Sequence, residues 1–351
     1  MAITSQTMAL LSARRQEVDQ VLADLDLALI SAWVGAWNDL SVEFDAALAD
    51  LMLAAKDGRV TGSQAAKNVR LRKALSLAVD RLDELAQFAE VTTQADVMRV
   101  ALAAAQSQID VALSQLPPAD RVAVLPTFTR VSDAALDAIV ARTTQNIATG
   151  LLPLSDDAVA VMKRNLVRGI AVGDNPRTVA RRMLRQAEQG FNGGLTRAMT
   201  IARTEMLDAH RAAGKAADMA NTDITTGWIW GASLDARTCP SCIAQHGQLH
   251  PVEEDGPIDH HQGRCARIPK TKTWKELGFD IEEPADLMQD SREWFDGLTD
   301  DTKRQIMGAE RLELLNSGAI KWEDLSTRRT TDGWRDAMHV TPVRDLRGLA
   351  T

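Results

Sequence analysis

Three cysteines and two adjacent histidines lie within one short window of the chain. Cys239 and Cys242 are separated only by a proline and a serine, so a tight turn can aim both sulfurs at one metal ion about 2.3 Å away. Cys265 follows His260 and His261 after three residues and supplies the third thiol. Thiolates combined with one imidazole suit zinc. The pattern therefore predicts a tetrahedral zinc site made of Cys239, Cys242, Cys265 and one of the two histidines, His260 or His261.

The predicted role of this metal is structural. Four protein ligands leave no coordination position for water. The loop between the two halves, from Gln248 to Pro257, is mostly polar, so burial alone would hardly hold it together and metal binding would supply that free energy. A reduced cluster without metal, or a redox role for Cys239 and Cys242, remains an alternative. His246 and His250 are expected at the surface.

Two catalytic interpretations use the same residues: a zinc-dependent hydrolase, and a histidine-metal nuclease built on Asp259-His260-His261. A catalytic zinc is usually accompanied by a general base and a motif such as His-Glu-x-x-His, which the sequence lacks. The nuclease needs a further His or Asn shortly downstream, and neither type occurs between Arg267 and Asn316. We therefore expect no enzyme, with a zinc-dependent nuclease or peptidase as the alternative.

The elements before this window are predicted to be long helices. Apolar residues step by three and four from residue 12 to about 55, again over 71–85, and in a third stripe over 98–116 that Pro117-Pro118 closes. This pattern predicts an antiparallel helical bundle over residues 1–125. The bundle is read either as a stalk or as ordinary core-forming helices. Trp33 and Trp37, one turn apart, are expected in its core.

The middle of the chain is predicted to be helical and basic. Ser132-Asp133, Ser155-Asp156-Asp157 and Asn175-Pro176 are typical helix starts, and Gly190 to Gly194 indicates a turn before another helix near Leu195. Residues 160–215 contain eleven Lys and Arg residues but only four Asp and Glu residues, although the whole chain has a net charge of -8. This segment could contact a DNA backbone, or it is a solvated helix face. The candidate contact residues are Arg177, Arg181, Arg182 and Arg185.

Composition limits the class of protein and its location in the cell. The 351 residues are 45% hydrophobic and 25% charged, as in globular proteins. The acidic balance argues against a surface devoted wholly to nucleic acid. No run of about 18 apolar residues and no signal-peptide pattern occurs, so we expect no membrane contact and a protein made in the cytoplasm.

Several of these motifs together carry a resemblance to a known family. They are Ile201-Ala-Arg203-Thr204-Glu205, then Trp228 and Trp230, then Asp235 through Cys242, and His260 through Cys265. In order and spacing they resemble the head-morphogenesis family of the phage Mu F protein. That family's cysteine subdomain ends in His-Pro-x-Cys-Arg-Cys. Alignment on Arg264 and Cys265 puts His260 at the family histidine and Gly263 where the first of these cysteines would stand. A weaker similarity over residues 294–325 extends the resemblance to roughly 195–330.

The resemblance implies a structural minor capsid protein of a tailed phage, associated with the portal vertex of the virion and assisting head assembly and genome packaging or delivery. Its partners would be the portal, other head proteins and packaged DNA. We interpret Arg203, Thr204 and Glu205 as fold-organising, ion-pairing helix residues rather than catalytic ones. Trp228 and Trp230, two apart, would share one face of a strand that packs on the core or the cysteine loop.

The expected fold is mainly α, in four segments. They are a long-helix bundle (1–125), a basic helical domain ending in the Ala-Arg-Thr-Glu helix (126–220), a small zinc-knuckle-like α+β subdomain with a short hairpin (221–270) and a helical C-terminal tail (271–351).

Overall fold

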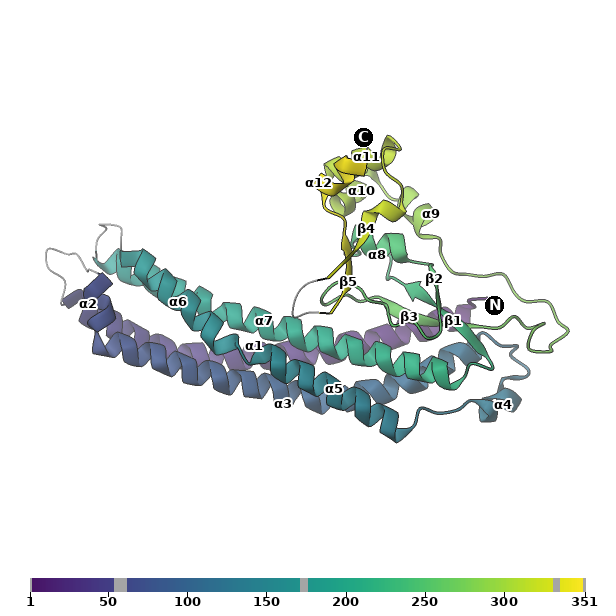
Figure 1. Cartoon of the computed structure of the whole chain (residues 1–351), viewed down its shortest axis with the longest axis horizontal. Helices are drawn as coiled ribbons and strands as arrows, with labels where there is room; N and C mark the ends of the chain where they lie inside the picture. Colours follow the sequence, from purple (N-terminus) through teal and green to yellow (C-terminus); the bar gives the residue numbers. More distant parts are fainter. Residues whose placement is uncertain (1, 54–61, 171–175, 331–334, 350–351) are drawn as a thin grey trace. The chain divides into compact units, whose positions relative to one another are not determined.

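The computed structural model describes residues 2–53, 62–170, 176–330 and 335–349, and these are mainly helical (Figure 1). The described chain forms two compact units. The helical unit consists of Asp19–Val97 and Ala141–Met206, and the sheet unit consists of Met1–Val18, Met98–Val140 and Leu207–Thr351. The predicted fold class, long helices with a small antiparallel sheet and a cysteine and histidine subdomain, is confirmed. The division into four segments stays a prediction.

Long helices dominate the first 220 residues. They are α1 (Ser5–Leu53), α3 (Val69–Ser114), α5 (Asp133–Leu151), α6 (Leu154–Ile170) and α7 (Pro176–Ala220), with the short α2 (Gly62–Lys67), α4 (Arg121–Val124) and a 3-10 turn (Leu125–Thr127) between them. In the helical unit, α1, α3, α6 and α7 run side by side (Figure 1). Leu25, Leu29, Trp33, Leu40 and Phe44 of α1 are buried there, because their spacing of three to seven residues keeps them on one helix face.

Two expectations about these helices were wrong. The second and third predicted helices are one helix, α3, because the stretch between them contains no Gly or Pro and buries Ala89, Thr93 and Val97 at a spacing of four. The expected turn at Gly190 to Gly194 lies inside α7. These glycines allow close packing: a Cβ on Gly190 would lie 2.7 Å from the Met162 side chain of α6. The predicted starts at Asp133 and Pro176 are confirmed, and α6 begins two residues earlier than predicted.

One described helix, α1, is long and apolar enough to cross a membrane by length and composition alone. The core helix of a globular protein passes the same test, and α1 buries a row of large side chains inside the helical unit. The expectation of no membrane contact therefore stays a prediction.

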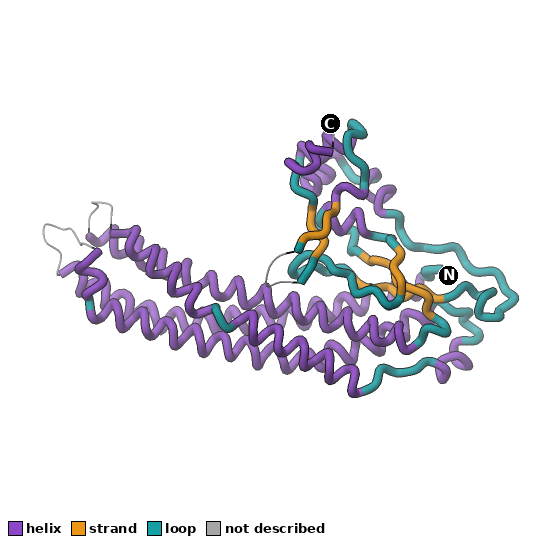
Figure 2. Tube along the Cα trace, viewed as in Figure 1, coloured by secondary structure: helices purple, strands orange, loops and turns teal. Residues whose placement is uncertain are grey.

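The sheet unit contains a three-stranded antiparallel sheet, with strands drawn in orange in Figure 2. They are β1 (Thr225–Gly231), β2 (Leu249–Pro251) and β3 (Ala266–Thr271), in the order β2-β1-β3, with the short helix α8 (Pro240–Gln245) between β1 and β2. The side chain of Gln115, just after α3, donates to the carbonyl of Pro269 at 2.8 Å and accepts from the N–H of Thr271. The end of α3 therefore fixes β3, the strand that follows the third cysteine.

The C-terminal tail packs on the cysteine subdomain. It contains α9 (Ser291–Asp296), α10 (Asp300–Met307), α11 (Ala309–Asn316), a 3-10 turn (Glu323–Leu325), the hairpin strands β4 (Ser326–Arg329) and β5 (Ala337–Val340), and α12 (Val343–Leu349). Its core includes Phe295, Met307 and Leu325, and Ala244 of α8 belongs to the same cluster. The sequence did not predict the β4-β5 hairpin, whose strands are only four residues long.

Candidate metal centre

The first two thiols lie at the start of α8. Cys239 is the N-cap residue, and its sulfur accepts a hydrogen bond from the N–H of Cys242 at 3.4 Å. Pro240 fits the first helical position because the amide hydrogen it lacks would have no partner in the helix. The Cys239 sulfur therefore meets the positive end of a helix, an environment that favours a thiolate.

His260 reaches this pair from the loop between β2 and β3. The candidate ligand atoms of Cys239, Cys242 and His260 all lie within 4.8 Å of one another, so the three could hold a metal ion. His260 Nδ1 is 2.9 Å from the carbonyl oxygen of His261. A carbonyl can only accept, so Nδ1 carries the hydrogen and donates it, which leaves Nε2 as the ring nitrogen for a metal.

Cys265, the fourth predicted ligand, lies beside this group without being part of it. It is buried in one cluster with Cys242 and with Trp228 and Trp230. A hydrogen bond between the thiols of Cys242 and Cys265 contributes to a raised pKa for Cys242. The donor set fits zinc, since three thiols and an imidazole converge from two loops. Cys265 as the fourth ligand stays a prediction.

The thiol and imidazole groups perturb each other strongly. A hydrogen bond from the Cys242 thiol, followed by one from His260, lowers the pKa of Cys239 to about 4. The hydrogen bond with Cys239 raises the pKa of His260 to about 9. Without metal, the structure therefore favours a Cys239 thiolate paired with a His260 imidazolium at neutral pH.

An ion pair between Arg264 and Asp235 joins the two halves of the site. The Arg264 guanidinium donates to both oxygens of Asp235 at 3.0 Å, and this contact lowers the pKa of Asp235 to about 2. Asp235 also accepts from the N–H of Arg237 and the hydroxyl of Thr238. The turn before Cys239 is thereby tied to the residue before Cys265.

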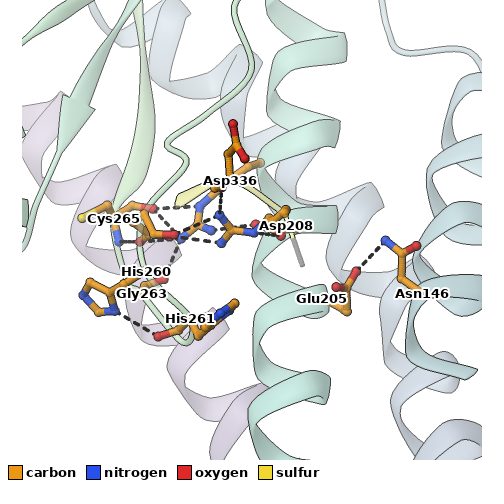
Figure 3. A network of polar contacts seen from close by, with 11 residues as sticks. Asn146, Glu205, Asp208, His260, His261, Gly263, Cys265 and Asp336 are labelled. Carbon is orange, nitrogen blue, oxygen red and sulfur yellow. Dashed lines mark hydrogen bonds and ion pairs between the residues drawn. The ribbon is translucent and has the colours of Figure 1, made fainter. Parts of the chain in front are cut away.

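A second, buried network holds the loop that carries His260 and Cys265 (Figure 3). Arg211 of α7 donates to the Asp259 carboxylate at 2.9 Å and to the carbonyls of Gly263 and Cys265. Arg335, just before β5, lies 2.5 Å from Asp208 and donates to the Asp259 carbonyl. Burial raises the pKa of Asp259, and the two arginines oppose that shift.

Asp259 of this network fills the space beside Gly263. A Cβ built on Gly263 would lie 2.1 Å from Oδ2 of Asp259. The buried carboxylate therefore leaves no room for a side chain at this position.

The two tryptophans lie in the wall of the site. Trp228 and Trp230 of β1 are 0% and 1% exposed, and their ring centroids are 6.1 Å apart. Trp228 also stacks on His250 at 4.1 Å. His246 accepts from the N–H of Ala232 at 2.9 Å. His246 and His250 are both half-buried, and neither belongs to the group that could hold a metal.

The other predicted residues lie on α7 within the helical unit. Arg203 forms an ion pair with Asp26 of α1, Thr204 is buried, and Glu205 accepts from Asn146 of α5 at 3.0 Å (Figure 3). Their fold-organising role stays a prediction. Of the four candidate DNA-contact arginines, Arg181 and Arg185 are exposed and Arg182 is half-buried, and the side chain of Arg177 lies outside the described residues.

The sequence interpretation missed the buried arginines. Besides Arg211, Arg267 of β3 is fully buried and its Nε lies 2.6 Å from the Asp218 carboxylate. Gln108 donates to both oxygens of Asp218, and Arg14 donates to Gln108 at 2.7 Å. One sequence signal could have indicated the burial of Arg267. It lies two residues after Cys265, so in an extended strand the two side chains point to the same face.

The fold and the site define a mainly helical protein that carries a cysteine and histidine subdomain on a small antiparallel sheet. Residues 160–269 match the family described as Phage Mu protein F like protein, as the resemblance predicted. Comparisons with curated proteins and with solved structures gave no match. The matched stretch contains all four predicted ligands, Arg211 and the candidate DNA-contact arginines.

Proposed function

We propose that the protein is a structural head-morphogenesis protein of a tailed phage, a minor capsid component that associates with the portal vertex and assists head assembly and genome packaging or delivery. The observation that carries this proposal is the family match over residues 160–269. The partners would be the portal and other head proteins, with packaged DNA contacted through Arg177, Arg181, Arg182 and Arg185, and the place of action would be the virion.

The metal site is proposed to be a structural zinc centre held by Cys239, Cys242, His260 and Cys265. A bound ion would close the loop between β2 and β3 against the start of α8. The carboxylates near these ligands in sequence support a structural role. Arg264 binds Asp235, and Arg211 with Arg335 engages Asp259. Each of these two carboxylates is paired with an arginine, which disfavours its use as a general base beside a metal-bound water.

Metal analysis and activity assays on the purified full chain test this proposal. We expect about one zinc per chain, lost in the Cys239→Ser, Cys242→Ser double variant. With zinc restored, the wild-type chain should cleave neither DNA nor a denatured protein substrate above the level of that variant. Metal-dependent cleavage abolished by the double variant would contradict the structural role and favour the nuclease or peptidase.

A further inference from the structure

One buried guanidinium makes four hydrogen bonds to the ligand loop, residues 259–265, which carries His260 and Cys265. Arg211 has a side chain 5% exposed and lies on α7. Its Nη2 donates to Asp259 Oδ2 at 2.9 Å, to the Gly263 carbonyl at 2.6 Å and to the Cys265 carbonyl at 3.1 Å, and its Nε donates to the Cys265 carbonyl at 3.1 Å. Asp208, one turn earlier on α7, accepts from Nη1 at 2.9 Å.

These contacts fix the backbone on both sides of Cys265. The Asp259 carboxylate, held by Arg211, accepts the N–H of Cys265 at 3.1 Å, while the Cys265 carbonyl accepts from Arg211 directly. His260 follows Asp259 in the chain, so the same clamp restricts the residue that precedes the imidazole. Arg211 on the long helix α7 therefore supports the backbone beside both ligands of this loop.

We propose that Arg211 is a positioning residue for the metal centre, which sets His260 and Cys265 opposite Cys239 and Cys242 before a metal binds. This inference rests on the proposed zinc centre. A preformed loop lowers the ordering cost of binding, and partners that orient metal ligands typically change metal affinity about 10- to 100-fold when removed.

The chemistry of the contact requires arginine. A planar guanidinium can serve a carboxylate and two carbonyls at fixed angles, whereas a lysine ammonium carries the same charge without that fork. Arg211→Lys therefore keeps a positive charge available to Asp259 and removes the geometry. A truncation would instead leave a buried carboxylate short of a cation, with a large loss of stability.

Arg267 provides a matched control. It is also fully buried and paired with an aspartate, Asp218, and it donates to two loop carbonyls, those of Val252 and Glu254. Its side-chain hydrogen bonds go to none of residues 259–265. Arg267→Lys should therefore reproduce the loss of stability that comes from changing a buried arginine, without disturbing the ligand loop.

The test is cobalt binding to the reduced full chain, with affinity measured by chelator competition and the thiolate-to-cobalt absorption recorded per bound ion. Arg211→Lys should bind about 10- to 100-fold more weakly than wild type and show weaker absorption per ion, because Cys265 is no longer positioned. Arg267→Lys should keep the wild-type spectrum, and its affinity should change much less. Equal affinity losses in both variants, or a wild-type spectrum and affinity in Arg211→Lys, would overturn the inference.

Asp259→Asn is a second variant for the case that Arg211→Lys does not fold. It keeps the shape of the side chain and weakens its contact with Arg211, so it should also lower cobalt affinity, and unchanged affinity would overturn the positioning role. If the wild-type chain itself binds neither cobalt nor zinc, the zinc centre fails and the positioning role fails with it. If the wild-type chain binds cobalt and both Arg211→Lys and Asp259→Asn bind it equally well, the positioning role is contradicted and the zinc centre is not.

Discussion

Cys239 combines a nucleophilic atom with partners that keep it ionised. The pKa of this thiol is lowered to about 4, first by the hydrogen bond from Cys242 and then by that from His260. A depressed pKa means that the thiolate is present above about pH 4 and is lost below it. Since only the thiolate reacts with alkylating agents, the metal-free protein should label at Cys239 at a nearly constant rate from pH 8 down to about pH 5.

Mass spectrometry after iodoacetamide labelling of the metal-free chain measures this dependence site by site. Cys242, whose pKa is raised by its hydrogen bonds to the two other thiols and by burial, serves as the internal control and should stay unlabelled. In His260→Gln the labelling of Cys239 should begin to fall at a higher pH. A Cys239 labelling rate that rises tenfold per pH unit between 6 and 8 would show an ordinary thiol and contradict the coupling.

The ligand types could be recognised from the sequence, but the charges that position them could not. The spacing of the cysteines and histidines predicted Cys239 and Cys242, and the resemblance selected His260; these three share one site. Arg211 and Asp259 are 48 residues apart, and nothing local distinguishes a buried arginine on a helix from a solvated one. Only the packing of α7 against the loop decides between them, and that packing is a long-range property.

At the scale of elements, α7 packs closely against α6 at Gly190. Gly190 is buried, and a Cβ there would lie 2.7 Å from Cγ of Met162 and 3.1 Å from its backbone nitrogen. Gly190→Ala should therefore lower the free energy of unfolding by about 1–3 kcal/mol, the usual cost of overpacking. Gly193, one turn along the same helix, has nothing within 4 Å of its Cβ position.

Gly193→Ala is thus the control, and it should raise the free energy of unfolding by about 0.5–1 kcal/mol because alanine favours the helix. Urea unfolding followed by circular dichroism measures both variants. Opposite signs would establish that the helices pack through Gly190. Stabilisation in both would mean that α6 and α7 do not approach closely at that point.

The same pair of glycines shows where sequence interpretation reaches its limit. Periodicity and capping residues predicted the helix starts at Asp133 and Pro176, which depend on local hydrogen bonding. A glycine, in contrast, predicts the end of a helix because it weakens a helix locally. A close contact with another helix can outweigh this cost, but the partner helix lies elsewhere in the sequence and leaves no local signal. The tail hairpin was missed for a related reason, since β4 and β5 are too short to show alternation.

The basic start of α7 allows a test of the proposed DNA contact. We expect that neutralising Arg181, Arg182 and Arg185 to glutamine weakens binding to duplex DNA and flattens its salt dependence by about 0.9 for each phosphate that is no longer neutralised. Fluorescence anisotropy over a salt series measures both quantities. A triple glutamine variant of Arg237, Arg292 and Arg344, which are exposed arginines outside α7, controls for net charge. Equally weakened binding in the two variants would indicate non-specific attraction only.

At the scale of the whole molecule, the proposed role requires a binding partner in the phage head rather than a substrate. The two units offer different surfaces, and the cysteine subdomain with its tail forms a closed core in which Ala244 of α8 packs among tail residues. If zinc adds to the contacts that hold α8 and the ligand loop together, its loss should loosen the part of the sheet unit on which the tail packs. Partner binding that uses the sheet unit would then depend on the metal.

Co-expression with the portal protein encoded in the same phage genome tests this dependence. We expect the wild-type chain to co-purify with the portal ring and the Cys239→Ser, Cys242→Ser double variant to lose most of this binding, because no metal then ties the ligand loop to the start of α8. Gly193→Ala, which leaves the sheet unit unchanged, is the control and should bind as wild type does. A double variant that folds, lacks zinc and still binds the ring would assign docking to the helical unit, whereas absence of wild-type binding under the same conditions would contradict the portal association itself.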